Sequence, residues 1–90
     1  MRNKVKMIRV TDVEPVDGFV LRLRFNDRTE RVVDLEEELW GPVFAPLKED
    51  PELFRAVRIE GESIAWPNGA DLAPEFLHSA GRQVYRSRPV

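Results

Sequence analysis

The segment "FVLRLRF", residues 19–25, decides the predicted fold. Side chains at every second position of a β-strand point to the same face. The apolar side chains of this segment therefore share one face and its two arginines lie on the other, which sets Phe19, Leu21, Leu23 and Phe25 against Val20, Arg22 and Arg24. A period of two with one apolar face predicts a strand that is buried on one side.

The flanking segments predict a strand before and after this one. Residues 5–13 form the first predicted strand, which the following "EP" ends, and "VDG" at 16–18 supplies a turn. After the central strand, "NDR" at 26–28 turns the chain, and "TERVVDL" at 29–35 returns as a third strand. These segments together predict an antiparallel meander of three strands.

Short helices are predicted after residue 35, where the alternation stops. Pro42, Pro46 and Pro51 are too closely spaced for one long helix, so several short helical turns are expected. The best-defined one begins at Asp50, whose side chain can accept hydrogen bonds from free backbone N–H groups, with Pro51 at the first helical position.

The remaining residues predict a hairpin and a last helix. "VRIE" at 57–60 and "SIAW" at 63–66 form the hairpin, and a helix over 74–79 ends at Gly81. The predicted fold is therefore α+β, with a three-stranded antiparallel meander extended by the short hairpin and short helices on one face. The expected core is apolar throughout: Phe19, Leu21, Leu23, Phe25, Val33, Leu35, Leu39, Phe44, Leu47, Leu53, Phe54, Ile59, Ile64, Trp66, Leu72 and Leu77.

Length and composition narrow the class of protein. Ninety residues predict a single domain, residues 1–90, and the absence of cysteine excludes disulfides and cysteine-based zinc sites. No apolar run approaches the ~20 residues that a membrane span needs, and the first residues lack the apolar region of a signal peptide. A cytoplasmic protein without a membrane association is expected.

Charge is distributed unevenly along the chain. Residues 1–9 and 82–90 carry +7 with no acid, and the stretch between them carries −9. The basic ends, 1–6 and 82–90, are consistent with flexible, solvated segments, with contacts to acidic groups of a neighbouring chain, or with contacts to nucleic-acid phosphates. Because no stacking platform or helix-turn-helix accompanies them, nucleic-acid binding by the isolated chain is not expected.

Few residues could carry catalysis, and neither a cofactor nor a metal ion is predicted. His78 is the only histidine, and it is expected at the surface or at a helix end. Glu36, Glu37 and Glu38 are consecutive, so on a helix their side chains fan apart and cannot converge on one ion. A small enzyme or ligand-binding domain would need Asp34, Asp71 and His78 to meet in one pocket.

The segment "WPNGAD", residues 66–71, admits two interpretations. Pro67, Asn68 and Gly69 suit a turn between a strand and a helix, which alone explains much of the motif. The same loop could recognise a partner through Trp66, Asn68, Gly69 and Asp71. A second candidate contact patch consists of Trp40 with Glu36, Glu37 and Glu38, which would attract a basic partner.

Three segments carry a resemblance to a known family. "LRLRFNDRTERVVDL", "GPVFAPLKEDPELFRAVRI" and "IAWPNGADLAPEFL", in this order, resemble the bacterial family called domain of unknown function 2442 (DUF2442). Two positions depart from the family pattern. Arg28 replaces the glycine common after Asp27, which predicts a different turn type, and Ala73 replaces the usual capping residue before Pro74, which predicts a helix start weaker by about 1 kcal/mol.

The resemblance implies a partner rather than a reaction. Its members are small α+β proteins, often encoded beside a second small protein of toxin-like type. The predicted function is a non-catalytic protein-interaction module, antitoxin-like or a regulatory partner of another small bacterial protein. A homodimer is also expected, because a small sheet covered on one face leaves its edges and its other face open.

Overall fold

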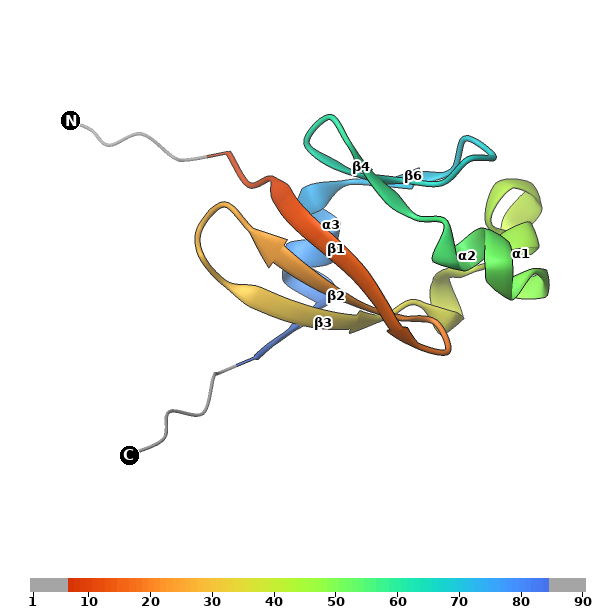
Figure 1. Cartoon of the computed structure of the whole chain (residues 1–90), viewed down its shortest axis with the longest axis horizontal. Coiled ribbons are helices and arrows are strands. Elements are labelled where there is room, and N and C mark those ends of the chain that lie inside the picture. The colour runs from red at the N-terminus through yellow and green to blue at the C-terminus, as the bar shows by residue number, and fades with distance from the viewer. Residues whose placement is uncertain (1–6, 85–90) are drawn as a thin grey trace.

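The meander is the core of a four-stranded antiparallel sheet (Figure 1). The computed structural model describes residues 7–84. The sheet runs in the order β1-β2-β3-β7 and comprises β1 (Val10–Asp17), β2 (Val20–Phe25), β3 (Glu30–Asp34) and β7 (Arg82–Gln83). Together with the helices, it confirms the predicted α+β fold and the three-stranded meander.

The predicted hairpin is present, but it belongs to a second sheet. This sheet consists of β4 (Arg58–Glu60), β5 (Ser63–Ala65) and β6 (Asp71–Leu72), in that order. The prediction that the hairpin extends the meander is therefore wrong. The edge of the meander beside β3 is taken by β7, and the hairpin pairs instead with the residues that follow its own turn. One backbone hydrogen bond, from Val10 N–H to the Glu62 carbonyl (2.9 Å), joins the two sheets.

Three α-helices and one 3₁₀ turn complete the fold. They are η1 (Glu36–Glu38), α1 (Gly41–Glu49), α2 (Pro51–Arg55) and α3 (Pro74–Ala80). The α3 helix lies behind β1 and β2 in Figure 1, and α1 and α2 lie together at the end of the sheet. The predicted start of α2 is confirmed, because Asp50 Oδ1 accepts hydrogen bonds from the N–H groups of Glu52 (3.1 Å) and Leu53 (3.4 Å).

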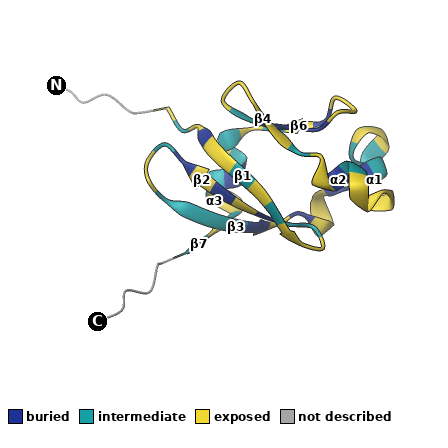
Figure 2. Cartoon of the chain, in the orientation of Figure 1, coloured by how far each residue is buried: buried dark blue, intermediate teal, exposed yellow. Residues whose placement is uncertain are grey.

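The predicted register of β2 is confirmed. Leu21, Leu23 and Phe25 are at most 2% exposed, and the alternation of buried and exposed residues is visible along the strand in Figure 2. Most of the predicted core is buried or packs against it as half-buried side chains. Ile59 is an error, being 38% exposed on the outer strand β4, and the small buried residues Ala65 and Ala70 were not predicted, nor was Val10.

The first strand differs from its prediction at both ends. It continues through Pro15 to Asp17, which is possible because β1 is an edge strand and the ladder is irregular between these two residues. At the other end, residues 7–9 are not in the strand. Asn26 binds this segment instead, accepting from Arg9 N–H (2.9 Å) and donating to the Met7 carbonyl (2.8 Å). Residues 5 and 6 of the prediction lie outside the described residues.

The turn between β2 and β3 corrects the expectation for Arg28. Arg28 has φ 73, in the left-handed region that glycine favours, and its N–H donates to the Phe25 carbonyl (3.0 Å). The Phe25 N–H in turn donates to the Thr29 carbonyl (3.0 Å). Arg28 thus takes the backbone conformation that suits glycine, at the left-handed position of a hairpin turn, and does not produce a different turn type.

We predict that Arg28→Gly stabilises the protein. A left-handed non-glycine residue costs roughly 1–2 kcal/mol, and glycine's greater freedom in the unfolded chain offsets part of that gain, so the expected net increase in unfolding free energy is about 0.5–1 kcal/mol. Chemical denaturation measures it. Arg28→Ala is the matched control, because it removes the side chain but keeps Cβ, and an equal gain from alanine would contradict the explanation by backbone strain.

Candidate functional site

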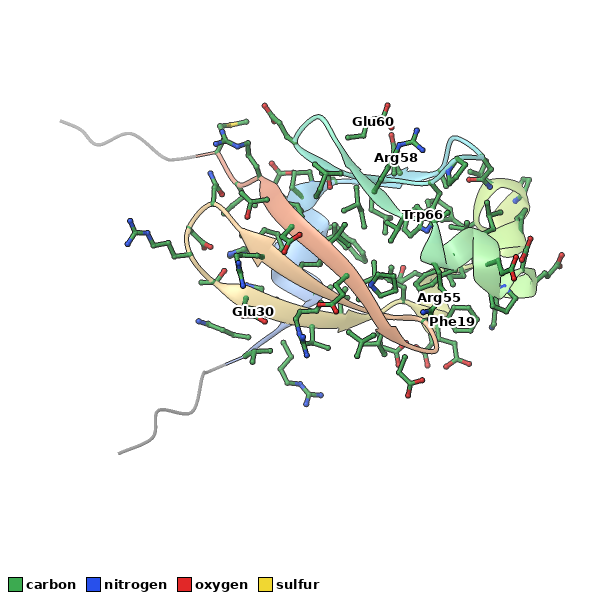
Figure 3. All side chains as sticks on the ribbon, viewed as in Figure 1. Phe19, Glu30, Arg55, Arg58, Glu60 and Trp66 are labelled. Carbon is green, nitrogen blue, oxygen red and sulfur yellow. The ribbon has the colours of Figure 1, made fainter. Side chains whose placement is uncertain are left out.

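The tryptophan of the "WPNGAD" loop belongs to the core. Trp66 is 1% exposed, and its indole N–H donates to the Phe54 carbonyl (2.9 Å). Its ring packs against those of Phe54 and Phe44, with centroids 5.9 and 6.5 Å away. Figure 3 shows it between the second sheet and α2. This burial removes the Trp66 side chain from the proposed contact surface.

Apart from the buried Ala70, the rest of the loop is exposed and attached to α1. Asn68 Oδ1 accepts from Ala70 N–H (3.1 Å), and its Nδ2 donates to the Val43 carbonyl (3.0 Å). Gly69 has φ 93, as the turn interpretation requires. Asn68, Gly69 and Asp71 remain accessible, but the bonds of Asn68 are used to hold the loop beside the first turn of α1.

The second predicted patch surrounds an apolar hollow. Trp40 is 74% exposed and Val43 46% exposed. The hollow has a volume of about 410 Å³, and its lining includes Glu38, Trp40, Pro42, Val43, Phe44 and Leu72. Because Leu72 follows the loop and Asn68 binds Val43, the two predicted patches lie side by side and form one surface. We call it the Trp40 surface: Trp40, Val43, Asn68 and Leu72, with the exposed acids Glu36, Glu37 and Glu38 beside it.

A second hollow, which sequence reasoning missed, lies along the small sheet and shares Leu72 with the first. It has a volume of about 660 Å³, and its lining includes Arg58, Glu60, Glu62, Ser63 and Asp71. The register aligns Arg58, Ala65 and Asp71 across the three strands, so Arg58 and Asp71 share one face of this sheet. Arg58 Nη2 lies 3.5 Å from Glu60 Oε1, and Figure 3 shows both side chains at this sheet. We call this the acidic hollow. It could have been predicted only from the pairing of Arg58 with Ala65 and of Ala65 with Asp71, which brings Arg58 and Asp71 to one face.

His78 pairs with a carboxylate that was not predicted. Its Nε2 lies 2.8 Å from Asp27 Oδ2, and its ring stands edge-on to that of Phe25, with centroids 4.9 Å apart. Partial burial of Asp27 opposes its ionisation, but hydrogen bonds from the Thr29 hydroxyl (2.6 Å), the Thr29 N–H (3.0 Å) and His78 outweigh it and lower the pKa of Asp27 from 3.8 to about 2. This pair joins α3 to the β2–β3 turn.

The candidate catalytic residues do not converge. His78, on α3, pairs with Asp27 at the β2–β3 turn. Asp34 lies at the other end of β3, about four residues of ~3.3 Å each from this turn, and its Oδ1 accepts from Glu36 N–H (3.0 Å). Asp71 lies in the second sheet. Among residues 7–84, no three His, Asp or Glu side chains are grouped so that they could hold a metal ion. The alternative of an enzyme that uses Asp34, Asp71 and His78 lacks a common reacting centre.

The comparison with protein families now decides the relationship. The family model described as "Protein of unknown function (DUF2442)" matches residues 10–82. The chain belongs to this family. Comparison with curated proteins and with solved structures found no match.

The DUF2442 match covers both sheets and all the helices, and it ends within β7. The Trp40 surface and the acidic hollow therefore lie inside the family domain. Most of the basic residues at the two ends lie outside the described residues, so their predicted flexibility and phosphate contacts stay predictions. Within the described part of the chain, no helix has the length and apolar character to cross a membrane.

We predict that replacement by phenylalanine destabilises this DUF2442 protein at Trp66 but not at Trp40. Trp66→Phe removes the indole donor from the Phe54 carbonyl, which keeps the longer bond from Val57 N–H (3.4 Å), and it leaves a void, so it should lower the unfolding free energy by roughly 2–4 kcal/mol. Trp40→Phe is the matched control and should change it by no more than ~0.5 kcal/mol, because Trp40 is exposed. Equal losses in a denaturation experiment would contradict the assigned burial.

We also predict that Asp27 makes stability depend on acid pH. Its pKa is lower in the folded protein (about 2) than its ordinary value of 3.8, so its contribution is complete above about pH 5 and is lost as the pH falls through 4 toward 2. Asp27→Asn should therefore destabilise the protein at about pH 5, and the difference from wild type should shrink toward pH 2. A constant difference in unfolding free energy across this range would contradict the prediction.

Proposed function

We propose that this DUF2442 protein is a non-catalytic interaction module that binds another small protein through the Trp40 surface. The observation that carries the proposal is the exposure of Trp40 (74%) and Val43 (46%) around one apolar hollow. Tryptophan is enriched among residues that dominate binding energy, and a cluster of exposed apolar side chains around a hollow is typical of a binding surface.

The magnitude of the burial supports a binding role for Trp40. An aromatic side chain buries roughly 150–250 Å² in an interface, which at ~25 cal/mol per Å² gives about 4–6 kcal/mol before the costs of association. Only a fraction survives those costs, but even about 1.4 kcal/mol is tenfold in affinity. Glu36, Glu37 and Glu38 beside the hollow favour a partner that is basic at this point.

The antitoxin-like or regulatory role rests on the family. The resemblance described above implies that members are often encoded beside a second small protein of toxin-like type. The separated positions of Asp34, Asp71 and His78 agree with a role in binding rather than in chemistry. We therefore propose that the partner is the product of the neighbouring gene, and that the complex, not a reaction of this chain, is the functional unit.

The proposal predicts that Trp40→Ala weakens capture of the purified neighbouring gene product. We expect a loss of affinity of about tenfold or more, measured by titration, with unchanged unfolding free energy. Val16→Ala is the matched control, because Val16 is also exposed (44%) but lies on β1, and Trp40→Ala should lose binding where Val16→Ala does not. Absence of binding by the wild-type chain, or equal binding by both variants, would contradict the proposal.

A further inference from the structure

We propose that Asn68–Gly69 is a deamidation site that the folded loop protects, and that its modification detaches the loop from α1. The proposal concerns a reaction of the loop with water and does not rest on the proposed function. Three hydrogen bonds that restrain the reacting groups carry it.

The sequence supplies the reacting groups. The chain has three asparagines, Asn3, Asn26 and Asn68, and only Asn68 precedes a glycine. Because glycine has no side chain, its backbone nitrogen can approach the preceding side-chain amide without steric hindrance. Asn68 and Gly69 are both exposed, and no atom lies within 4 Å of the position that a Cβ on Gly69 would take. Water therefore reaches this dipeptide.

The reaction needs no partner other than water. The Gly69 nitrogen loses its proton to solvent and attacks Cγ of Asn68, so an N–Cγ bond forms. The Cγ–Nδ2 bond breaks, and Nδ2 takes a proton from solvent and leaves as ammonia. Water then opens the resulting succinimide ring at either of its carbonyl groups, which leaves aspartate or isoaspartate at position 68. In total, water is consumed, ammonia is released and a neutral amide becomes a carboxylate.

The fold holds both reacting groups in hydrogen bonds that the reaction must break. Gly69 N–H donates to the carbonyl of the buried Trp66 (3.0 Å), and this is the proton that has to be removed. Asn68 Nδ2, the leaving nitrogen, donates to the Val43 carbonyl (3.0 Å). Asn68 Oδ1 accepts from Ala70 N–H (3.1 Å), so the amide is fixed at both ends and cannot turn freely toward the Gly69 nitrogen.

These bonds make the rate of deamidation depend on local opening of the loop. A segment that opens while the rest of the protein stays folded reacts only during the fraction of time for which it is open. The contact of Asn68 with Val43 joins the loop to the first turn of α1. Movement of α1 away from the loop should therefore expose Asn68 to the reaction.

The product no longer fits the position that Asn68 occupies. A carboxylate has no proton to donate, so its negative oxygen would face the partly negative oxygen of the Val43 carbonyl. Isoaspartate also lengthens the backbone by one atom, which disrupts the turn closed by Ala70 N–H. Because Asn68 holds the loop beside Val43, deamidation would separate the loop from the rest of the Trp40 surface.

Incubation of the full-length chain at mildly alkaline pH, with and without denaturant, tests the protection. We expect Asn68 to deamidate about tenfold more slowly, or slower still, in the folded chain than in the denatured one. A peptide of residues 64–72 under both conditions corrects for the effect of denaturant on the chemistry. Equal corrected rates, or a faster reaction in the folded chain, would overturn the proposal.

Peptide mapping by mass spectrometry provides the readout at position 68. Asp17 also precedes a glycine and can form isoaspartate through the same kind of ring. Only deamidation replaces an amide by a carboxyl group and so changes the mass. The two reactions are thereby distinguished in one sample.

Two phenylalanine variants separate the contact with α1 from the stability of the whole fold. Phe44 and Phe76 are both half-buried and packed against the core. Phe44 follows Val43 on α1, and its ring centroid lies 6.5 Å from that of Trp66, whereas Phe76 is on α3. Truncation of Phe44 should therefore loosen the first turn of α1.

Phe44→Ala should accelerate deamidation of Asn68 by about tenfold or more under conditions in which the chain remains folded. Phe76→Ala is the matched control and should leave the rate within about twofold of wild type, because it weakens the core without freeing the loop. Equal acceleration in both variants would contradict protection by the contact with α1.

Asn68→Asp reproduces one product directly and remains informative if either phenylalanine variant fails to fold. It should raise the unfolding equilibrium constant roughly two- to tenfold at neutral pH, because the Val43 carbonyl loses its donor. The difference from wild type should shrink below about pH 4, where the introduced carboxyl group is protonated and can donate again. Unchanged stability at neutral pH, or a difference that does not depend on pH, would overturn the inferred detachment.

Discussion

Burial of Trp66 joins parts of the fold that backbone hydrogen bonds leave almost separate. The two sheets share one described backbone bond, from Val10 to Glu62, so side-chain packing must hold them together. Trp66 contributes to that packing through α2. Its ring and its N–H both meet Phe54, and the Phe54 ring in turn stands edge-on to that of Phe19 beside β2, with centroids 5.2 Å apart. A buried polar group left unpaired costs about 1–3 kcal/mol, so this hydrogen bond fixes the orientation of the ring as well as its depth.

Features that depend on neighbouring residues could be predicted from the sequence. The buried face of β2 follows from its alternation, and the start of α2 from Asp50 and Pro51, because both signals act within a few positions. The separate second sheet could not be predicted, because it depends on which edges are free once β7 has paired with β3. The predicted end of the first strand at Pro15 was wrong for a similar reason. Proline breaks a central strand but not an edge strand, and only the strand order of the sheet shows that β1 is at the edge.

The candidate site was predictable in composition but not in arrangement. Both tryptophans were selected, yet one is in the core and the other is exposed, since the difference is made by contacts distant in sequence. Asn68 bonds to Val43 and so places the loop beside the first turn of α1, where Trp40 stays outside. Glu60 and Glu62 were read only as parts of a hairpin, because their proximity to Asp71 depends on the pairing of β5 with β6.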